Sequence, residues 1–183
     1  MKAAVVTFPG SNCDDDAVYA LSKFAGFETN SVWHKERPSF GEHQLVVLPG
    51  GFSYGDYLRC GAVASLAPVM QSVKEYAERG GLVLGICNGF QILCESGLLP
   101  GALTFNESQK FICKDVALKT TNVRAPWTSE MKVGEQVEWP IAHGDGRYWT
   151  DPDGLAKLQA NKQVLFTYSQ NPNGSVGDIA GIC

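Results

Sequence analysis

A cysteine between two glycines is the strongest chemical signal in the sequence. Cys87 follows the apolar run Leu82–Ile86, with Gly85 two residues before it and Gly89 two residues after it. This spacing at a strand-to-helix turn is typical of hydrolases that expose a nucleophile on a tight elbow, here with Cys in place of Ser. The positive end of a helix starting at Asn88 is expected to lower the pKa of the thiol. The alternative is a buried and inert cysteine.

A second glycine-rich turn offers what such a nucleophile needs. Gly50 and Gly51 follow the apolar run Leu45–Leu48. Their exposed backbone N–H groups are suited to stabilise an oxyanion, together with the N–H of Asn88 at the start of its helix. A phosphate-binding loop is the alternative, and it is disfavoured because no Gly-Lys-Ser/Thr follows.

The first half of the chain predicts the sheet that positions these turns. Short apolar strands alternate with helices that begin near Asn12 or Asp14, at Pro68 and at Asn88. Strands that are apolar on both faces indicate an α/β fold, a doubly wound and mostly parallel sheet with helices on both faces. Its ligand site is expected at the carboxyl ends of the strands. The predicted strands are 3–8, 29–33, 45–48 and 82–86.

The second half has a different pattern. It predicts an antiparallel section, with strands over 111–121, 137–142, 164–168 and 179–183 and a short helix from Asp151. No long linker or internal repeat divides the chain, so we expect a single domain over 1–183. The sequence ends within a predicted strand, which indicates a truncated C-terminus.

Composition excludes several classes of function. A net charge of −4 and a pI of about 5.3 provide no basic surface for nucleic acid. No segment is long and apolar enough for a membrane span or a signal peptide, so a cytoplasmic location is expected. The six cysteines include no Cys-x-x-Cys pair, which argues against a metal site.

Four segments together carry a family resemblance. They are PGGFSYGDYLRCGA (49–62), GLVLGICNGFQIL (81–93), PIAHGDGRYW (140–149) and NPNGS (171–175) with IAGIC (179–183). They resemble the class I, triad-type glutamine amidotransferases. Within that family they are most similar to the glutaminase subunits of phosphoribosylformylglycinamidine synthases, and the likeness runs from Met1 to Cys183.

The resemblance implies roles for the matching residues. Cys87 would attack the side-chain amide of glutamine, form a γ-glutamyl thioester and release ammonia. The N–H groups of Gly51 and Asn88 would form the oxyanion hole, and Gln91 would contact the substrate. The α-groups of glutamine would be held by the backbone of the loop His143, Gly144 and Asp145.

The general base of the family is not among these residues. It is a His in a His-Pro-Glu motif beyond the strand that ends at Cys183, so this chain as written is expected to be inactive. His34 and His43 are assigned surface or structural roles. A non-catalytic module that binds glutamine or a partner is therefore an alternative. A DJ-1-like cysteine hydrolase is another, but the Gly-Gly-Phe-Ser-Tyr-Gly-Asp loop and Gln91 argue against it.

The resemblance also implies the partners. No cofactor is expected in this chain. ATP and Mg would be bound by a synthetase subunit, which would use the ammonia in de novo purine biosynthesis, with a small accessory subunit in the same complex. The contact surface is predicted at Phe52, Tyr54, Tyr57 and Arg59, the alternative being that these side chains only pack within the domain.

Overall fold

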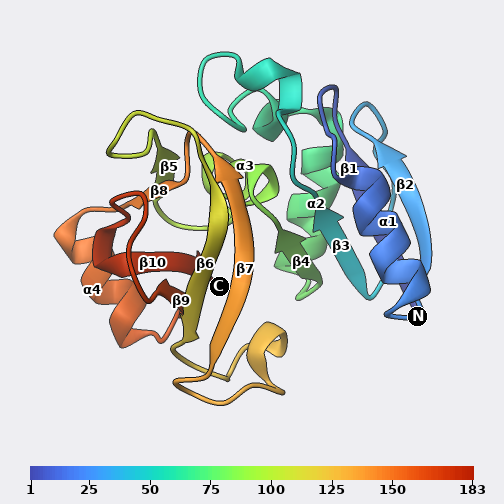
Figure 1. Ribbon diagram of the computed structural model, residues 1–183. Coiled ribbons are helices and arrows are strands. Elements are labelled where there is room, and N and C mark those ends of the chain that lie inside the picture. Colours follow the sequence, from blue (N-terminus) through green and yellow to red (C-terminus); the bar gives the residue numbers. More distant parts are fainter. The chain divides into compact units, whose positions relative to one another are not determined.

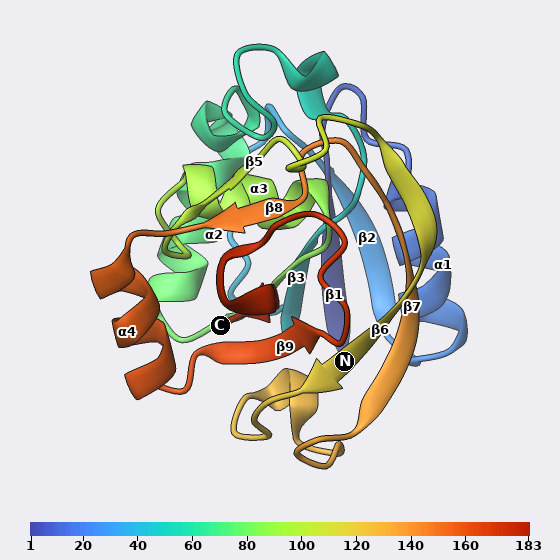
Figure 2. The same cartoon turned by 60° about the vertical axis from the view of Figure 1, so that its left-hand side comes forward.

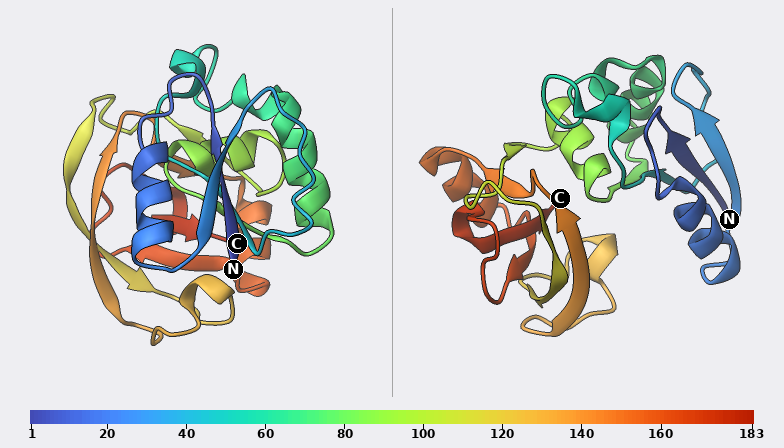
Figure 3. Two further views of the ribbon diagram at one scale, coloured as in Figure 1. Left: turned by 90° about the vertical axis from the view of Figure 1, so that its right-hand side faces the viewer. Right: turned by 45° about the horizontal axis from the view of Figure 1, so that its top comes forward.

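The computed structural model describes residues 1–183. They form two compact units, Met1–Leu98 and Leu99–Cys183. Figure 1 labels the helices and strands of both units, and Figures 2 and 3 show the same elements from other directions.

A four-stranded parallel sheet forms the centre of the first unit (Figure 1). Its order is β2-β1-β3-β4, and β1 and β3 are the central strands. Residues 3–6 of β1 and all four residues of β3 are buried, as expected for short apolar strands covered on both faces. The predicted parallel sheet is confirmed. The strands are β1 (Lys2–Thr7), β2 (Glu28–Trp33), β3 (Leu45–Leu48) and β4 (Leu82–Gly85).

Three helices pack on this sheet: α1 (Asp14–Lys23), α2 (Pro68–Glu78) and α3 (Asn88–Glu95). Helix α1 contacts β1 and β2, α2 contacts β4, and α3 contacts both β3 and β4. Pro68 occupies the first turn of α2, as the sequence predicts. The predicted caps of α1 are wrong, because its N-cap residue is Cys13 and no side chain caps the helix. The side-chain oxygen of Asn12 instead accepts a hydrogen bond from the Cys13 thiol, at 3.3 Å.

Strand β4 differs from the buried strand that its apolar sequence suggests. It lies at the edge of the sheet and pairs only with β3. Leu82 is 39% exposed and Ile86, directly after the strand, is 47% exposed. An apolar run predicts a strand, but it does not tell whether one or two neighbours pair with that strand.

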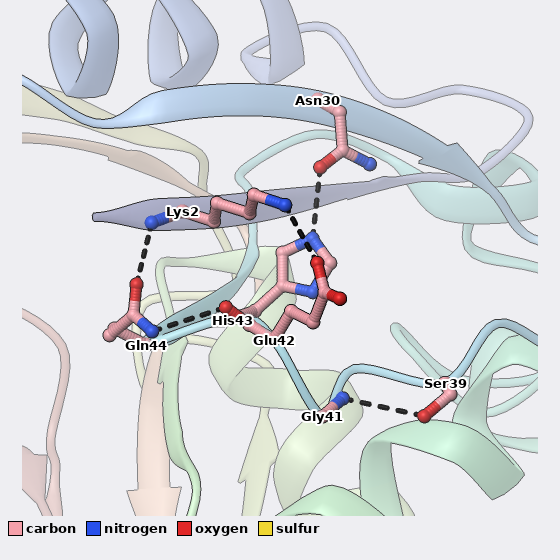
Figure 4. Close-up of polar contacts among 7 residues, drawn as sticks. All are labelled: Lys2, Asn30, Ser39, Gly41, Glu42, His43 and Gln44. Carbon is pink, nitrogen blue, oxygen red and sulfur yellow. Dashed lines mark hydrogen bonds and ion pairs between the residues drawn. The ribbon is translucent and has the colours of Figure 1, made fainter.

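Polar contacts tie together the amino-terminal side of the sheet (Figure 4). The backbone N–H of Lys2 donates to Oε1 of Gln44 at 2.6 Å, and its Nζ forms an exposed ion pair with Glu42 at 2.7 Å. Nε2 of His43 lies 3.0 Å from Oδ1 of Asn30. His43 thus precedes β3, whereas the candidate nucleophile follows β4. Since the two strands are parallel, these residues lie at opposite ends of the sheet.

The second unit is built on an antiparallel sheet of order β10-β9-β6-β7. Its core contains Val116, Leu118, Leu165 and Phe166. Helix α4 (Pro152–Ala160) is capped by Asp151, whose carboxylate accepts from the N–H of Gly154 at 2.6 Å. The strands are β6 (Ile112–Thr120), β7 (Gln136–His143), β9 (Val164–Tyr168) and β10 (Ile179–Ile182), which confirms the predicted antiparallel section.

A separate pair of three-residue strands, β5 (Ala102–Thr104) and β8 (Arg147–Trp149), was not predicted, because such short strands show no readable alternation. Single 3-10 turns occur at Ser53–Asp56, Ala64–Leu66, Pro126–Thr128 and Val176–Asp178. None of the helices combines the length and apolar character that crossing a membrane requires.

Candidate active site

Cys87 stands on the predicted elbow between β4 and α3. It is the N-cap residue of α3 and has φ 50° and ψ −106°. A non-glycine residue in such a conformation stores about 1–3 kcal/mol of strain, which the surrounding contacts must hold in place. The residue is exposed and its thiol is free. The strained turn therefore presents the sulfur at the carboxyl end of the sheet.

The two flanking glycines allow the close packing that makes the turn possible. A β-carbon at Gly89 would lie 1.9 Å from the carbonyl oxygen of Leu48, in the neighbouring strand. One at Gly85 would lie 2.6 Å from Cδ1 of Leu93 and 2.7 Å from the carbonyl oxygen of Gly89. Helix α3 thus sits directly against the strand ends, and this contact fixes the position of Cys87.

The electrostatic surroundings of the thiol differ from the expectation. Desolvation of the sulfur by the protein groups around it raises the pKa of Cys87, although the residue is exposed, and this outweighs the Asn88 N–H, which lowers it. The negative charge of Asp56 and the nearby thiol of Cys13 raise the pKa further. The predicted net decrease is wrong because a single helix N-terminus does not offset desolvation where no cation faces the sulfur.

The glycine turn after β3 lies beside the nucleophile. A β-carbon at Gly50 would lie 3.7 Å from Cβ of Cys87. Gly51 has φ 148°, and a β-carbon there would lie 2.8 Å from Cα of Ser11, so only glycine fits this backbone path. The N–H of Gly51 makes no hydrogen bond within the protein, whereas the next N–H, that of Phe52, donates to Gly10 at 2.9 Å. The N–H of Gly51 is therefore an unused backbone donor in this turn.

Asn88 connects the two turns through its side chain. It is 2% exposed, and its Oδ1 accepts from the N–H of Ser53 at 3.2 Å. Its Nδ2 donates to Oε1 of Gln91 at 2.8 Å. Gln91, which was predicted to contact the substrate, is itself buried at 6% exposure. These bonds hold the turn after β3 against the start of α3.

The residues predicted to contact a partner have different surroundings. Phe52 is 46% exposed and Tyr57 is 77% exposed. The hydroxyl of Tyr54 lies 2.5 Å from Nδ1 of His34, inside the unit. Arg59 forms a two-pronged ion pair with Glu95, with both N–O distances 2.6 Å. Phe52 and Tyr57 are thus the two exposed aromatic residues of this set, and the exposed Arg59 side chain is held by Glu95.

The structure brings together within the first unit Cys87, Gly51, Asn88 and Gln91. His143, Gly144 and Asp145 belong to the second unit, at the end of β7 and in the turn that follows. There, burial lowers the pKa of His143. Sequence reasoning gave His34 a surface or structural role without finding its partner Tyr54, and it missed Asn106, which contacts the His143 turn at four points. No local pattern around either residue marks these contacts, because their partners lie 20 and 37–40 residues away.

An exposed cysteine on a strand–helix elbow, beside an unused backbone N–H and the first N–H of a helix, is the arrangement typical of α/β enzymes that use a cysteine nucleophile. The whole chain, residues 1–183, matches the family of CobB/CobQ-like glutamine amidotransferase domains. The protein belongs to this family.

Individual relatives agree with this assignment. A phosphoribosylformylglycinamidine synthase subunit PurQ from Alkaliphilus metalliredigens is 55% identical over 183 residues, which is 100% of this chain and 80% of the relative. The same subunit from Salinibacter ruber is 52% identical over 190 residues, covering 99% of this chain and 80% of the relative.

Solved structures show the same fold. A chain from the structure of PurLQS from Thermotoga maritima superposes with a TM-score of 0.90 at 47% identity, covering 99% of this chain and 80% of that one. A GMP synthase-type protein from Thermoplasma acidophilum has a TM-score of 0.58 at 16% identity, covering 84% of this chain and 69% of that one. The second likeness concerns the fold alone.

Proposed function

We propose that the protein is the glutaminase subunit of a phosphoribosylformylglycinamidine synthase and supplies ammonia for purine biosynthesis. The observation that carries this is Cys87, an exposed thiol on a strained elbow directly beside the Gly51 turn. The identity of more than half of all residues to subunits of that name supports the same assignment. A cytoplasmic location is part of the proposal.

The proposed reaction uses the elbow as a nucleophile. The sulfur of Cys87, as thiolate, attacks the side-chain carbonyl carbon of glutamine. The negative charge that forms on the oxygen is stabilised by the N–H groups of Gly51 and Asn88. The C–N bond then breaks and ammonia leaves with a proton, which gives a γ-glutamyl thioester. Water hydrolyses the thioester, releases glutamate and regenerates the thiol.

The raised pKa of Cys87 shows that the reaction needs a base. A thiol that is protonated at neutral pH needs a positioned acceptor for its proton. His34 is held by Tyr54, and His43 lies at the other end of the sheet. Neither histidine of the first unit therefore takes this role. The proposal follows the family resemblance, in which the base is a His of a His-Pro-Glu motif.

The proposal includes a synthetase partner. Ammonia released into water at neutral pH becomes ammonium, which is not a nucleophile, so hydrolysis is useful only when it is coupled to an acceptor site. The synthetase subunit would bind ATP and Mg, with a small accessory subunit in the complex and no cofactor in this chain. The exposed side chains of Phe52 and Tyr57 are the first candidates for the contact surface.

A labelling experiment tests the nucleophile. A chloromethyl ketone analogue of glutamine should modify Cys87 selectively, and free glutamine should protect it. Cys13 and Cys113 are also exposed and serve as internal controls, because a simple alkylating agent should reach them as well. Equal labelling of all three cysteines by the glutamine analogue, measured by peptide mass mapping, would overturn the assignment of Cys87.

A turnover experiment tests the function. Glutamate release should be measured for the protein with its synthetase subunits, and for the same complex with Cys87→Ala or Cys113→Ala. Cys87→Ala should abolish glutamine-dependent synthesis but leave ammonia-dependent synthesis intact, and Cys113→Ala should change neither. A Cys87→Ala complex that still hydrolyses glutamine would refute the proposed function.

A further inference from the structure

A cavity of about 430 Å³ lies in the second unit, at the end of helix α4. Every residue that lines it belongs to this unit, so the cavity is formed by one compact body. The lining comes from the segment after β6, from the end of α4, and from β9 and β10, which Figure 1 labels. The volume is in the range in which proteins bind small molecules.

The charge of this lining is entirely positive. Arg124 and Lys162 line the cavity, and no Asp or Glu does. Neither cation takes part in an ion pair, because the two ion pairs of the protein join other residues. Asp178 is close in the sequence to the lining, but its carboxylate accepts from Nδ2 of Asn171 at 2.8 Å. Two uncompensated cations beside one cavity favour an anionic ligand.

One buried amide holds the backbone of both cations. Asn122 is 8% exposed, and its Nδ2 donates to the carbonyl oxygen of Lys162 at 2.8 Å. Its Oδ1 accepts from the N–H of Arg124 at 3.3 Å. Next to it, the hydroxyl of Thr121 donates to the carbonyl oxygen of Val164 at 2.5 Å. The two segments that carry the cations are therefore joined before any ligand binds, which lowers the entropic cost of binding.

The backbone of Lys162 has a conformation that favours a different residue type. Lys162 follows Asn161, the C-cap of α4, and has a φ of 57°. Glycine is usual at this position, because a side chain in the left-handed region costs about 1 kcal/mol or more. A lysine at such a position is consistent with a role for its ammonium group in the cavity.

An apolar wall lies beside the two cations in the same cavity. It is formed by Val133, Leu158, Val164 and Ile179. Leu158 and Ile179 are each 1% exposed and therefore belong to the core of the unit. An inorganic anion is only a few times the size of a water molecule, so it would fill a small part of the cavity and leave this wall without a contact. The expected ligand thus carries an organic part as well as a charge.

A phosphate group suits the polar part of the lining better than a carboxylate. Gln159 and Thr167 also line the cavity, with an amide and a hydroxyl as further donors. A phosphomonoester carries a charge of about −1.5 to −2 at neutral pH and has three acceptor oxygens. A guanidinium group binds two of these oxygens at once. A carboxylate has a single charge, which would leave one of the two cations uncompensated.

We propose that this cavity binds a small phosphomonoester whose organic part, a nucleoside or a sugar, packs on the apolar wall. Arg124 and Lys162 bind the phosphate, and Asn122 is the positioning residue for both. None of these residues belongs to the Cys87 elbow or to the His143 turn. The proposal is therefore independent of the proposed function, and either of the two can fail without the other.

Calorimetric titration of the isolated protein tests the ligand class. Synthetase subunits are left out, because they would add a nucleotide site of their own. The probes are AMP, ribose 5-phosphate, adenosine and inorganic phosphate. AMP or ribose 5-phosphate should bind about 10-fold or more tightly than inorganic phosphate, since only the esters reach the apolar wall. The tighter of the two esters identifies the organic part. Adenosine binding as tightly as AMP, or no binding of either ester at millimolar concentration, would overturn the proposal.

Removal of each cation tests the residues. Arg124→Gln and Lys162→Gln should each weaken binding of the tighter ester about 10-fold, the loss expected for a hydrogen bond to a charged group. Lys157→Gln is the matched control, because Lys157 is an exposed lysine of α4 that does not line the cavity. It should leave the affinity unchanged. Equal losses in Lys157→Gln and Lys162→Gln would show a general effect of charge and overturn the assignment of Lys162.

Val133→Ser tests the apolar wall. Val133 is 66% exposed, so its substitution should change the stability of the protein little. The variant should bind the tighter ester severalfold more weakly and inorganic phosphate with unchanged affinity, because only the ester contacts this side chain. An unchanged affinity for the ester would show that its organic part does not pack on the wall.

Chemical shifts locate the bound ester. In the 1H–15N NMR spectrum, the amide signals of Arg124, Lys162 and Thr167 should shift when the tighter ester is added, and those of Gly51 and Asn88 should not. The affinity should fall as NaCl is added, since salt screens exposed cations. Shifts confined to residues of the first unit would overturn the placement of the site.

Discussion

The hydroxyl of Tyr54 lies 2.5 Å from Nδ1 of His34, between the turn after β3 and the end of β2. The backbone around Tyr54 needs such an anchor, because Tyr54 and Asp56 have φ values of 54° and 56°. Each non-glycine residue in that region costs of the order of 1 kcal/mol or more. His34 is itself fixed, since its N–H donates to Thr7 at 3.0 Å and its carbonyl accepts from Val69 at 3.1 Å. The sheet thereby holds the loop that carries Gly51.

Tyr54→Phe is expected to loosen this loop while leaving the ring in place. The substitution removes the hydroxyl and leaves Nδ1 of a buried imidazole without its partner, which should lower the free energy of unfolding by about 1–3 kcal/mol. The kcat for glutamine should fall, because the Gly51 N–H is held less firmly. Urea unfolding and glutamate release measure the two effects. Tyr57→Phe is the control, since Tyr57 is 77% exposed. Equal stability of both variants would contradict the anchoring role of Tyr54.

The stability of the protein should decrease as the pH falls below about 6.5, the ordinary pKa of histidine. Burial lowers the pKa of both His34 and His143 in the folded protein. At a pH between the lowered pKa values of the folded protein and 6.5, the unfolded chain binds more protons than the folded protein. The free energy of unfolding therefore falls as the pH decreases through this window. Urea unfolding between pH 7.5 and 5.5 measures this slope. His34→Gln should reduce it, and an unchanged slope would show that His34 does not contribute.

Gly51→Ala should reduce glutamine hydrolysis strongly. The added β-carbon would meet Cα of Ser11 at 2.8 Å and the backbone N of Asn12 at 3.0 Å, so the turn must move. Loss of one oxyanion donor typically costs about 100- to 1,000-fold in kcat. Gly55→Ala is the matched control, because it has a positive φ of 65° but no atom within 4 Å of its added β-carbon. A Gly51→Ala complex with wild-type kcat would exclude Gly51 as a donor.

Gly89→Ala should displace helix α3. Its β-carbon would lie 1.9 Å from the carbonyl oxygen of Leu48, which only a backbone shift can relieve. Overpacking of this kind costs about 1–3 kcal/mol of stability. It should also slow the labelling of Cys87, since the elbow moves with the helix. At Gly97, beyond the end of α3, nothing lies within 4 Å of an added β-carbon. Gly97→Ala should therefore leave labelling unchanged, and equal labelling rates in both variants would contradict the packing argument.

The sequence alone determined the parts of the protein that depend on neighbouring residues. Gly85, Cys87 and Gly89 specify the elbow, because the backbone of a tight strand–helix turn needs glycine at these spacings. The apolar run Leu45–Leu48 specifies a buried strand, and Pro68 the start of a helix. These are local preferences, and they act before any tertiary contact forms.

The tertiary structure decided what depends on residues that are distant in the sequence. The pKa of Cys87 rises although a helix starts next to it, because all the surrounding segments together desolvate its sulfur. Tyr54 forms a hydrogen bond with His34, which lies 20 residues away in the sequence, and Asn106 forms one with His143, which lies 37 residues away. No periodicity or spacing encodes such pairs. A side-chain hydrogen bond depends on where two segments meet after folding, and that position is set by the packing of the whole unit.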